Sequence, residues 1–201
     1  MKKLFTTSAL VFTSIAGAFA QTEQGSLLVG SSISQLTYAT SADGGRKDFT
    51  LGVTPTVGFF VANRLAVGAE INLAYVSTNA SYGNGGFKGK GLEYGLAPFA
   101  RYYVLDAPKH KFFGQASYGI AGYSGKSESY DGGYSQTNKG SYWSGSVGVG
   151  YNYFISPMVA LEVQPYYRRT STDLEDDIRK NRWGVSVGFQ IFFPKTAAAA
   201  Q

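Results

Sequence analysis

The sequence predicts an all-β chain that folds into an eight-stranded antiparallel up-and-down β-barrel. Three observations lead to this prediction: apolar and small residues alternate along eight segments, the connections between them alternate between long and short, and no helical period competes. Cysteine is absent, so we expect neither a disulfide framework nor a thiolate metal site. The fold must therefore be held by its strand pairing.

Residues 1–20 are predicted to be a secretory signal peptide that is removed before Gln21. Lys2 and Lys3 precede a largely apolar stretch, and the small residues Ala18 and Ala20 close it. A transmembrane anchor is the competing interpretation, but five Ser and Thr residues interrupt the stretch. We expect residues 21–193 to form one barrel domain and residues 194–201 to form a short C-terminal tail.

The predicted strands share a period of two residues, which is clearest in residues 49–59. The other seven lie near residues 27–33, 65–75, 92–102, 112–120, 143–153, 159–167 and 183–193. Connections 39–47, 76–90, 124–140 and 169–180 are long and polar, connections 61–64 and 155–158 are short, and connection 104–111 is intermediate. Short turns at one end and longer loops at the other are typical of outer-membrane barrels.

Three prolines fall inside predicted strands, at positions 55, 98 and 165. Each proline removes one donor from the ladder, and a closed barrel has no edge strand on which to place it. We therefore expect β-bulges at Pro55, Pro98 and Pro165.

Alternation alone fits both a lipid-facing barrel and a water-soluble, ligand-carrying barrel. The second face of the strands decides between them, because it carries mostly Gly, Ser, Thr and Ala rather than the long charged residues of a water-exposed face. Small residues suit the narrow interior of an eight-stranded barrel. The sequence thus predicts a transmembrane β-barrel in a bacterial outer membrane, reached by export through the periplasm.

Aromatic residues gather at the strand ends and predict two girdles around an aliphatic band. The lower girdle comprises Phe59, Tyr102, Phe112, Tyr153 and Phe193, and the upper girdle comprises Tyr75, Tyr94, Trp143, Tyr167 and Trp183. In a soluble protein such residues would sit in the middle of the core.

With its signal peptide, eight strands, two girdles and a last strand that ends in Gln190-Ile191-Phe192-Phe193, the chain resembles the small outer-membrane β-barrel family. This family includes the transmembrane domain of outer membrane protein A and outer membrane protein X. The resemblance covers residues 25–193 and implies two kinds of partner, outer-membrane lipids and the barrel-assembly machinery. Family members usually end at the terminal aromatic that this machinery reads, whereas Pro194 to Gln201 follow Phe193 here.

Six charged residues fall on the interior parity of their strands, and they predict a charge network in the lumen. They are Glu70, Glu93, Arg101, Glu162, Arg168 and Arg182. Unpaired charges in such an interior cost several kcal/mol each, so three acids and three bases suggest mutual pairing. One interpretation is that this charge network is a structural plug that fixes the barrel interior. The other, implied by the resemblance to outer membrane protein A, is a gate in which Arg101 pairs with Glu70 or Glu162 and a change of partner opens a solute path.

The chain is predicted not to be an enzyme. Its one histidine, His110, lies between Lys109 and Lys111 in a periplasmic connection, away from an outward-facing site that would need a general base. No cofactor is implied. The acidic run at 173–177 lacks the spacing of a calcium loop, and the scattered Lys and Arg residues predict no nucleic-acid binding.

Connections 124–140 and 169–180 are candidate surfaces for an extracellular ligand. The first combines Tyr130 and Tyr134 with many Gly and Ser residues, a composition found in recognition loops as well as in solvated ones. The sequence therefore predicts an integral outer-membrane protein with a structural or surface-interaction role. The alternative function is a narrow porin-like channel for ions or small solutes.

Overall fold

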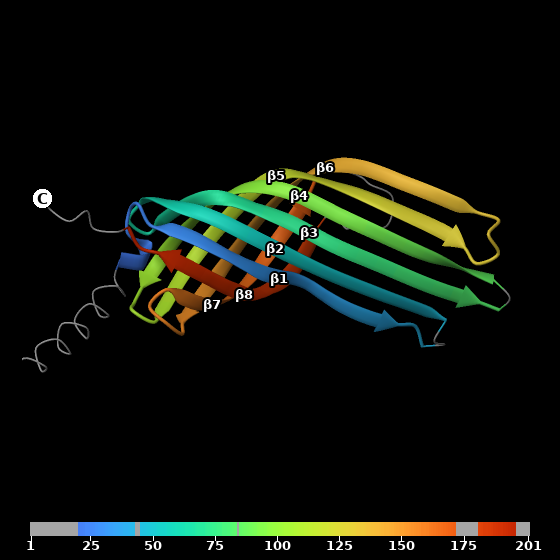
Figure 1. Cartoon of the computed structure of the whole chain (residues 1–201), viewed down its shortest axis with the longest axis horizontal. Coiled ribbons are helices and arrows are strands. Elements are labelled where there is room, and N and C mark those ends of the chain that lie inside the picture. Colours follow the sequence, from blue (N-terminus) through green and yellow to red (C-terminus); the bar gives the residue numbers. More distant parts are fainter. Residues whose placement is uncertain (1–19, 43–44, 84, 172–180, 196–201) are drawn as a thin grey trace, which may run out of the picture.

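The computed structural model describes residues 20–42, 45–83, 85–171 and 181–195, and these residues form one closed sheet (Figure 1). A 3-10 turn, η1 (Ala20–Thr22), precedes eight strands. They are β1 (Leu27–Thr40), β2 (Arg46–Ala62), β3 (Leu65–Tyr82), β4 (Gly85–Asp106), β5 (His110–Ser129), β6 (Ser135–Phe154), β7 (Val159–Thr170) and β8 (Asn181–Phe193).

Each strand pairs antiparallel with its neighbours in the sequence, and β1 pairs with β8 to close the barrel. The predicted eight-stranded up-and-down barrel is therefore confirmed. Residues 1–19 of the predicted signal peptide, residues 196–201 of the tail and the acidic run at 173–177 lie outside the described residues.

Alternation along β2 illustrates why these segments form strands of a barrel. Thr54 and Thr56 are buried in the interior, whereas Leu51, Val57 and Phe59 are exposed on the outer wall. Side chains of a strand point alternately to its two faces, so a run with small polar residues at one parity and large apolar residues at the other fits this arrangement. The exposed apolar wall follows from that parity.

The expected bulges at Pro55, Pro98 and Pro165 are wrong. Each proline stays in register with one neighbouring strand, respectively β1, β3 and β8. On its other side the ladder skips a short stretch and resumes in the same register. A missing N–H points toward only one neighbour, so it interrupts one ladder without inserting a residue. The register shifts lie elsewhere, at Ile33/Gln35, Phe60/Ala62 and Tyr103/Leu105.

Two of the connections that were predicted to be long polar loops, 76–90 and 124–140, are largely strand in their described residues, whereas residues 172–180 of connection 169–180 lie outside the described part of the chain. Strands β3 to β6 contain 18 to 22 residues, whereas β7 and β8 contain 12 and 13. In Figure 1 the hairpins of β2 to β6 run well past the ends of β7 and β8. Their polar residues pair with those of neighbouring strands, as Lys90 of β4 does with Lys126 of β5. The hydrogen-bonded ladder therefore continues into a region where both faces of the sheet can contact water.

An aromatic cluster fills the interior near the end of the barrel that carries the short turns, and the sequence analysis did not anticipate it. Its members are Leu28, Phe60, Ala66, Phe99, Tyr103, Phe113, Phe154, Ala160 and Phe192. Ring centroids lie 5.8 Å apart for Phe60 and Tyr103, 5.5 Å for Tyr103 and Phe113, and 4.9 Å for Phe154 and Phe192. This interior plug, made of those nine residues, blocks the lumen.

Removing one ring from the interior plug should destabilise the barrel more than removing a ring from its outer wall. We expect Phe192→Ala, at a fully buried position, to lower the free energy of unfolding by about 3–5 kcal/mol because it leaves a cavity. The matched control is Phe189→Ala in the same strand, which is 46% exposed and whose space lipid refills. Urea unfolding in lipid vesicles measures both, and equal losses would contradict the interior packing.

Candidate functional site: the charged layer inside the barrel

Arg101 of β4 and Glu162 of β7 form a buried ion pair that crosses the lumen. Arg101 is 1% exposed and Glu162 is 4% exposed. Two guanidinium nitrogens, Nη1 and Nη2, donate to the two carboxylate oxygens at 2.7 and 3.2 Å. The Arg101 guanidinium also lies 3.9 Å from the centroid of the Phe113 ring. This bidentate geometry on top of the interior plug fixes both side chains.

Neutral polar side chains add further hydrogen bonds to this layer. Glu162 accepts from Asn152 at 2.9 Å and from Gln190 at 3.2 Å. Gln115 accepts from Nε of Arg101 at 2.7 Å and donates to Glu70 at 3.0 Å. Glu70 is thus connected to Arg101 through an amide rather than by an ion pair. These amides all have interior parity, but they carry no charge, so the predicted charge network did not include them.

The remaining three predicted lumen charges lie closer to the hairpin end and are only half-buried. Arg168 donates to Asn72 at 2.9 Å, and Arg182 donates to Gln35 at 2.9 Å. Within the described residues, neither arginine forms an ion pair with Glu93 or with any other carboxylate. The six predicted charges therefore fall into two levels: a level around Arg101 that contains an ion pair, and a level nearer the hairpins in which amide oxygens accept hydrogen bonds from Arg168 and Arg182.

Two small cavities flank the Arg101 layer. One is lined by Asn72, Glu93 and Tyr142 among others, the second by Glu70, Arg101 and Glu162 among others, and each has a volume of about 30 Å³. That volume holds about one water molecule. The two cavities therefore have room for isolated waters beside the charged layer.

A second ion pair closes the short-turn end of the lumen. Lys111 of β5 is fully buried and contacts Asp106 of β4, which also accepts from the Thr22 hydroxyl at 2.5 Å. Arg64 in the β2–β3 turn lies 3.7 Å from the same carboxylate. Lys111 was predicted to lie in connection 104–111, whereas it belongs to β5, and this pair was therefore not predicted.

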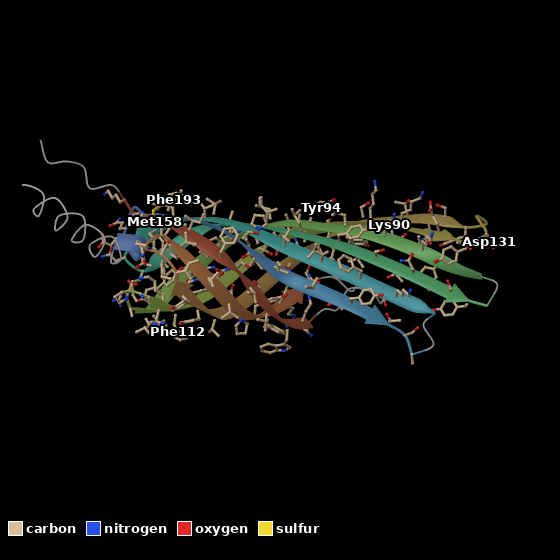
Figure 2. All side chains as sticks on the ribbon, turned by 60° about the horizontal axis from the view of Figure 1, so that its bottom comes forward. Lys90, Tyr94, Phe112, Asp131, Met158 and Phe193 are labelled. Carbon is tan, nitrogen blue, oxygen red and sulfur yellow. The ribbon has the colours of Figure 1, made fainter. Side chains whose placement is uncertain are left out.

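The ten predicted girdle residues all point away from the lumen. Nine are exposed, from 40% for Tyr75 to 80% for Trp183, and Tyr167 is half-buried. Figure 2 shows Phe112 and Phe193 near the end with the termini, with Tyr94 farther along and Lys90 beyond it toward Asp131. The wall between them exposes aliphatic side chains such as Ile71, Leu96 and Val187.

His110 is the first residue of β5, at the short-turn end of the barrel. Its Nδ1 lies 2.6 Å from the hydroxyl of Tyr151, and its ring packs beside Tyr153. Within the described part of the chain, no three His, Cys, Asp or Glu side chains gather closely enough to hold a metal ion. That part also contains no helix long and apolar enough to cross a membrane.

A closed eight-stranded barrel with an apolar outer wall and a filled lumen defines a small outer-membrane β-barrel protein. The chain belongs to the outer membrane protein beta-barrel domain family, whose model matches residues 5–190. The protein therefore resides in the bacterial outer membrane, where lipid contacts its apolar wall. No curated protein matches the sequence.

Solved structures of the same fold share little sequence with this chain. A major outer membrane protein from Thermus thermophilus matches with a TM-score of 0.53 and 11% identity, over 85% of this chain and 100% of that one. OprG from Pseudomonas aeruginosa matches with a TM-score of 0.49 and 14% identity, over 88% and 99%. The outer membrane enzyme PagL matches with a TM-score of 0.39 and 15% identity, over 82% and 98%.

Neutralising Arg101 should destabilise the barrel strongly, because Glu162 would be left buried without a counter-charge. We expect Arg101→Gln to lower the free energy of unfolding by about 3–5 kcal/mol. Glu128→Gln is the control, since it removes the exposed Lys126–Glu128 pair and should cost under about 1 kcal/mol. The double variant Arg101→Met/Glu162→Met should recover much of the loss. Urea unfolding in vesicles checks all three, and a mild effect of Arg101→Gln would refute a tightly coupled pair.

Proposed function

We propose that this protein has a structural and surface-interaction role, as a sealed barrel that holds a β-hairpin platform above the outer membrane. The hairpin platform comprises the parts of β3 to β6 that extend beyond β7 and β8. The observation that carries this proposal is the contrast between its two halves. The lumen is blocked by the interior plug and by the Arg101–Glu162 pair. The hairpins of β3 to β6, in contrast, extend far beyond β7 and β8 (Figure 1).

Positive charge on the outer face of this platform supports the binding of a negatively charged partner. Lys88 and Lys90 of β4, Lys126 of β5 and Lys139 of β6 are all exposed, and Lys90 lies opposite Lys126. Like charges opposite each other destabilise a sheet, and a bound anion would offset this repulsion. One carboxylate, Glu128, lies among them, and hydrogen bonding to Lys126 lowers the pKa of this carboxyl, as do the charges of Lys90 and Lys88.

A narrow channel is the second candidate, and the two water-sized cavities beside Arg101 favour it. Conduction would require the Arg101–Glu162 pair to separate and the interior plug to rearrange. We do not propose an enzymatic role, because His110 lies at the opposite end of the barrel from the platform. The absence of enzymatic activity remains a prediction.

Planar-bilayer recording separates the two candidates. We expect neither the wild-type protein nor Arg101→Gln to give conductance steps, because the interior plug remains in place when the ion pair is broken. Insertion is verified in the same membranes by protease accessibility of the hairpins. Regular steps in the wild-type protein that change in size or lifetime in Arg101→Gln would establish the channel instead.

Shortening one hairpin tests the platform. Gly125 and Asn138 lie opposite each other in the β5–β6 ladder, so residues 126–137 can be replaced by Asn-Gly without changing the register. We expect the shortened protein to assemble normally but to lose binding to dextran sulfate, a probe for anionic partners, while neutral dextran binds neither form.

Charge variants complete this test. Lys90→Gln/Lys126→Gln should weaken dextran sulfate binding several-fold, whereas Lys109→Gln, in the turn before β5, should leave it unchanged. Unaltered binding in both the shortened protein and the double variant would exclude the platform as the interaction surface.

A further inference from the structure

The outer wall of the barrel contains a groove that neither the sealed lumen nor the hairpin platform explains. It has a volume of about 470 Å³ and runs along β6, between β5 and β7. Tyr118, Trp143, Gly145, Val147, Tyr167 and Arg169 line it. This volume lies within the range of about 300–1,000 Å³ that is usual for ligand sites.

Gly145 creates the floor of the groove. It lies on the outward parity of β6, opposite Tyr118 on β5 and opposite Arg169 on β7. The outward positions before and after it in β6 hold the large side chains of Trp143 and Val147. A Cβ at position 145 would approach Cδ2 of Tyr118 to 3.1 Å, so a larger residue would fill the floor.

Aromatic rings hold the two walls of the groove in place. Tyr118 and Trp143 stack with their centroids 5.6 Å apart and their planes 7° apart. On the opposite wall, the Tyr167 hydroxyl donates to Asn181 at 2.7 Å, and its ring packs 5.0 Å from that of Trp183. The groove therefore exists before any ligand binds, which lowers the entropic cost of ordering one.

Arg169 gives the groove a cationic flank, level with Gly145 across the β6–β7 ladder. It follows Tyr167 on the same face of β7, toward the hairpin end, and its side chain is exposed. Aromatic residues at this height mark the boundary between hydrocarbon and headgroups. Arg169 lies between the levels of Tyr167 and Trp143, because Trp143 pairs with Ser171, so its guanidinium lies at this boundary. An apolar groove that faces hydrocarbon and is flanked by a guanidinium at headgroup level complements an acyl chain attached to a phosphate.

We infer that this groove binds one phosphate-bearing lipid of the outer leaflet, with the phosphate at Arg169 and an acyl chain that runs from Gly145 along Val147 toward the middle of the membrane. Guanidinium groups bind phosphate through two parallel hydrogen bonds, so arginine suits this position better than lysine. The site is separate from the lysines of the hairpin platform, and its existence does not depend on the proposed function.

Tryptophan quenching by brominated lipids tests the inference directly. The chain has two tryptophans, so Trp183→Phe leaves Trp143, in the wall of the groove, as the reporter. In vesicles of mixed phosphatidylglycerol and phosphatidylcholine, with one lipid brominated in its acyl chains, we expect Trp143 to report a roughly two- to fivefold preference for the anionic lipid, the range of an exposed ion pair.

Three further variants make the result specific. In the Trp183→Phe background, Arg169→Gln should abolish the preference, Arg169→Lys should retain part of it, and Gly145→Val should reduce quenching by both lipids. The control reporter is Ile71→Trp in a Trp143→Phe/Trp183→Phe background, on the outward face of β3, where we expect no preference.

Equal quenching by the two lipids at Trp143, or a preference that persists in Arg169→Gln or also occurs at position 71, would overturn the assignment. Inorganic phosphate added to the vesicles should leave the preference unchanged, because the acyl chain supplies part of the binding. Loss of the preference on adding phosphate would instead identify an ion site without a lipid. The heat-dependent gel shift of folded barrels checks that each variant assembles.

Discussion

Hydrocarbon offers no hydrogen-bonding partners, so the whole fold depends on the pairing of β1 with β8, which removes the last free edges of the sheet. Once that ladder is closed, one face of every strand must point to lipid and the other into a narrow space. The apolar wall, the small interior residues and the buried charges all follow from this division. The three strand prolines respect it, because each interrupts one ladder locally and leaves the register intact.

The filling of the lumen follows from its width. An eight-stranded barrel is only just wide enough for side chains, so each level of the interior is occupied by residues that reach across it. Arg101 and Glu162 come from strands on different sides of the barrel and meet end to end. Below them, rings from β2, β4, β5, β6 and β8 pack together. Charged and aromatic levels thus complement each other, and a cation–π contact between Arg101 and Phe113 joins them.

Residue parity was sufficient to predict the fold and the interior position of Arg101, Glu70 and Glu162, but not their partners. Which charges meet depends on the stagger of the strands, and this sets Glu162 rather than Glu70 beside Arg101. The interior plug has a signal in the sequence. Each lower-girdle aromatic has an aromatic neighbour in the chain, as in Phe112-Phe113, so one ring of each doublet must point inward. The hairpin platform was missed because polar residues were equated with loops.

The unequal strand lengths have a consequence within the plane of the membrane. Long strands β3 to β6 stand beside the short strands β7 and β8, so one side of the described barrel rises as a wall above a low rim (Figure 1). Two opposite sides of the barrel therefore differ in height and present different surfaces. Neighbouring molecules in a crowded bilayer would meet different surfaces according to the direction of approach, and lateral packing around this protein would be directional.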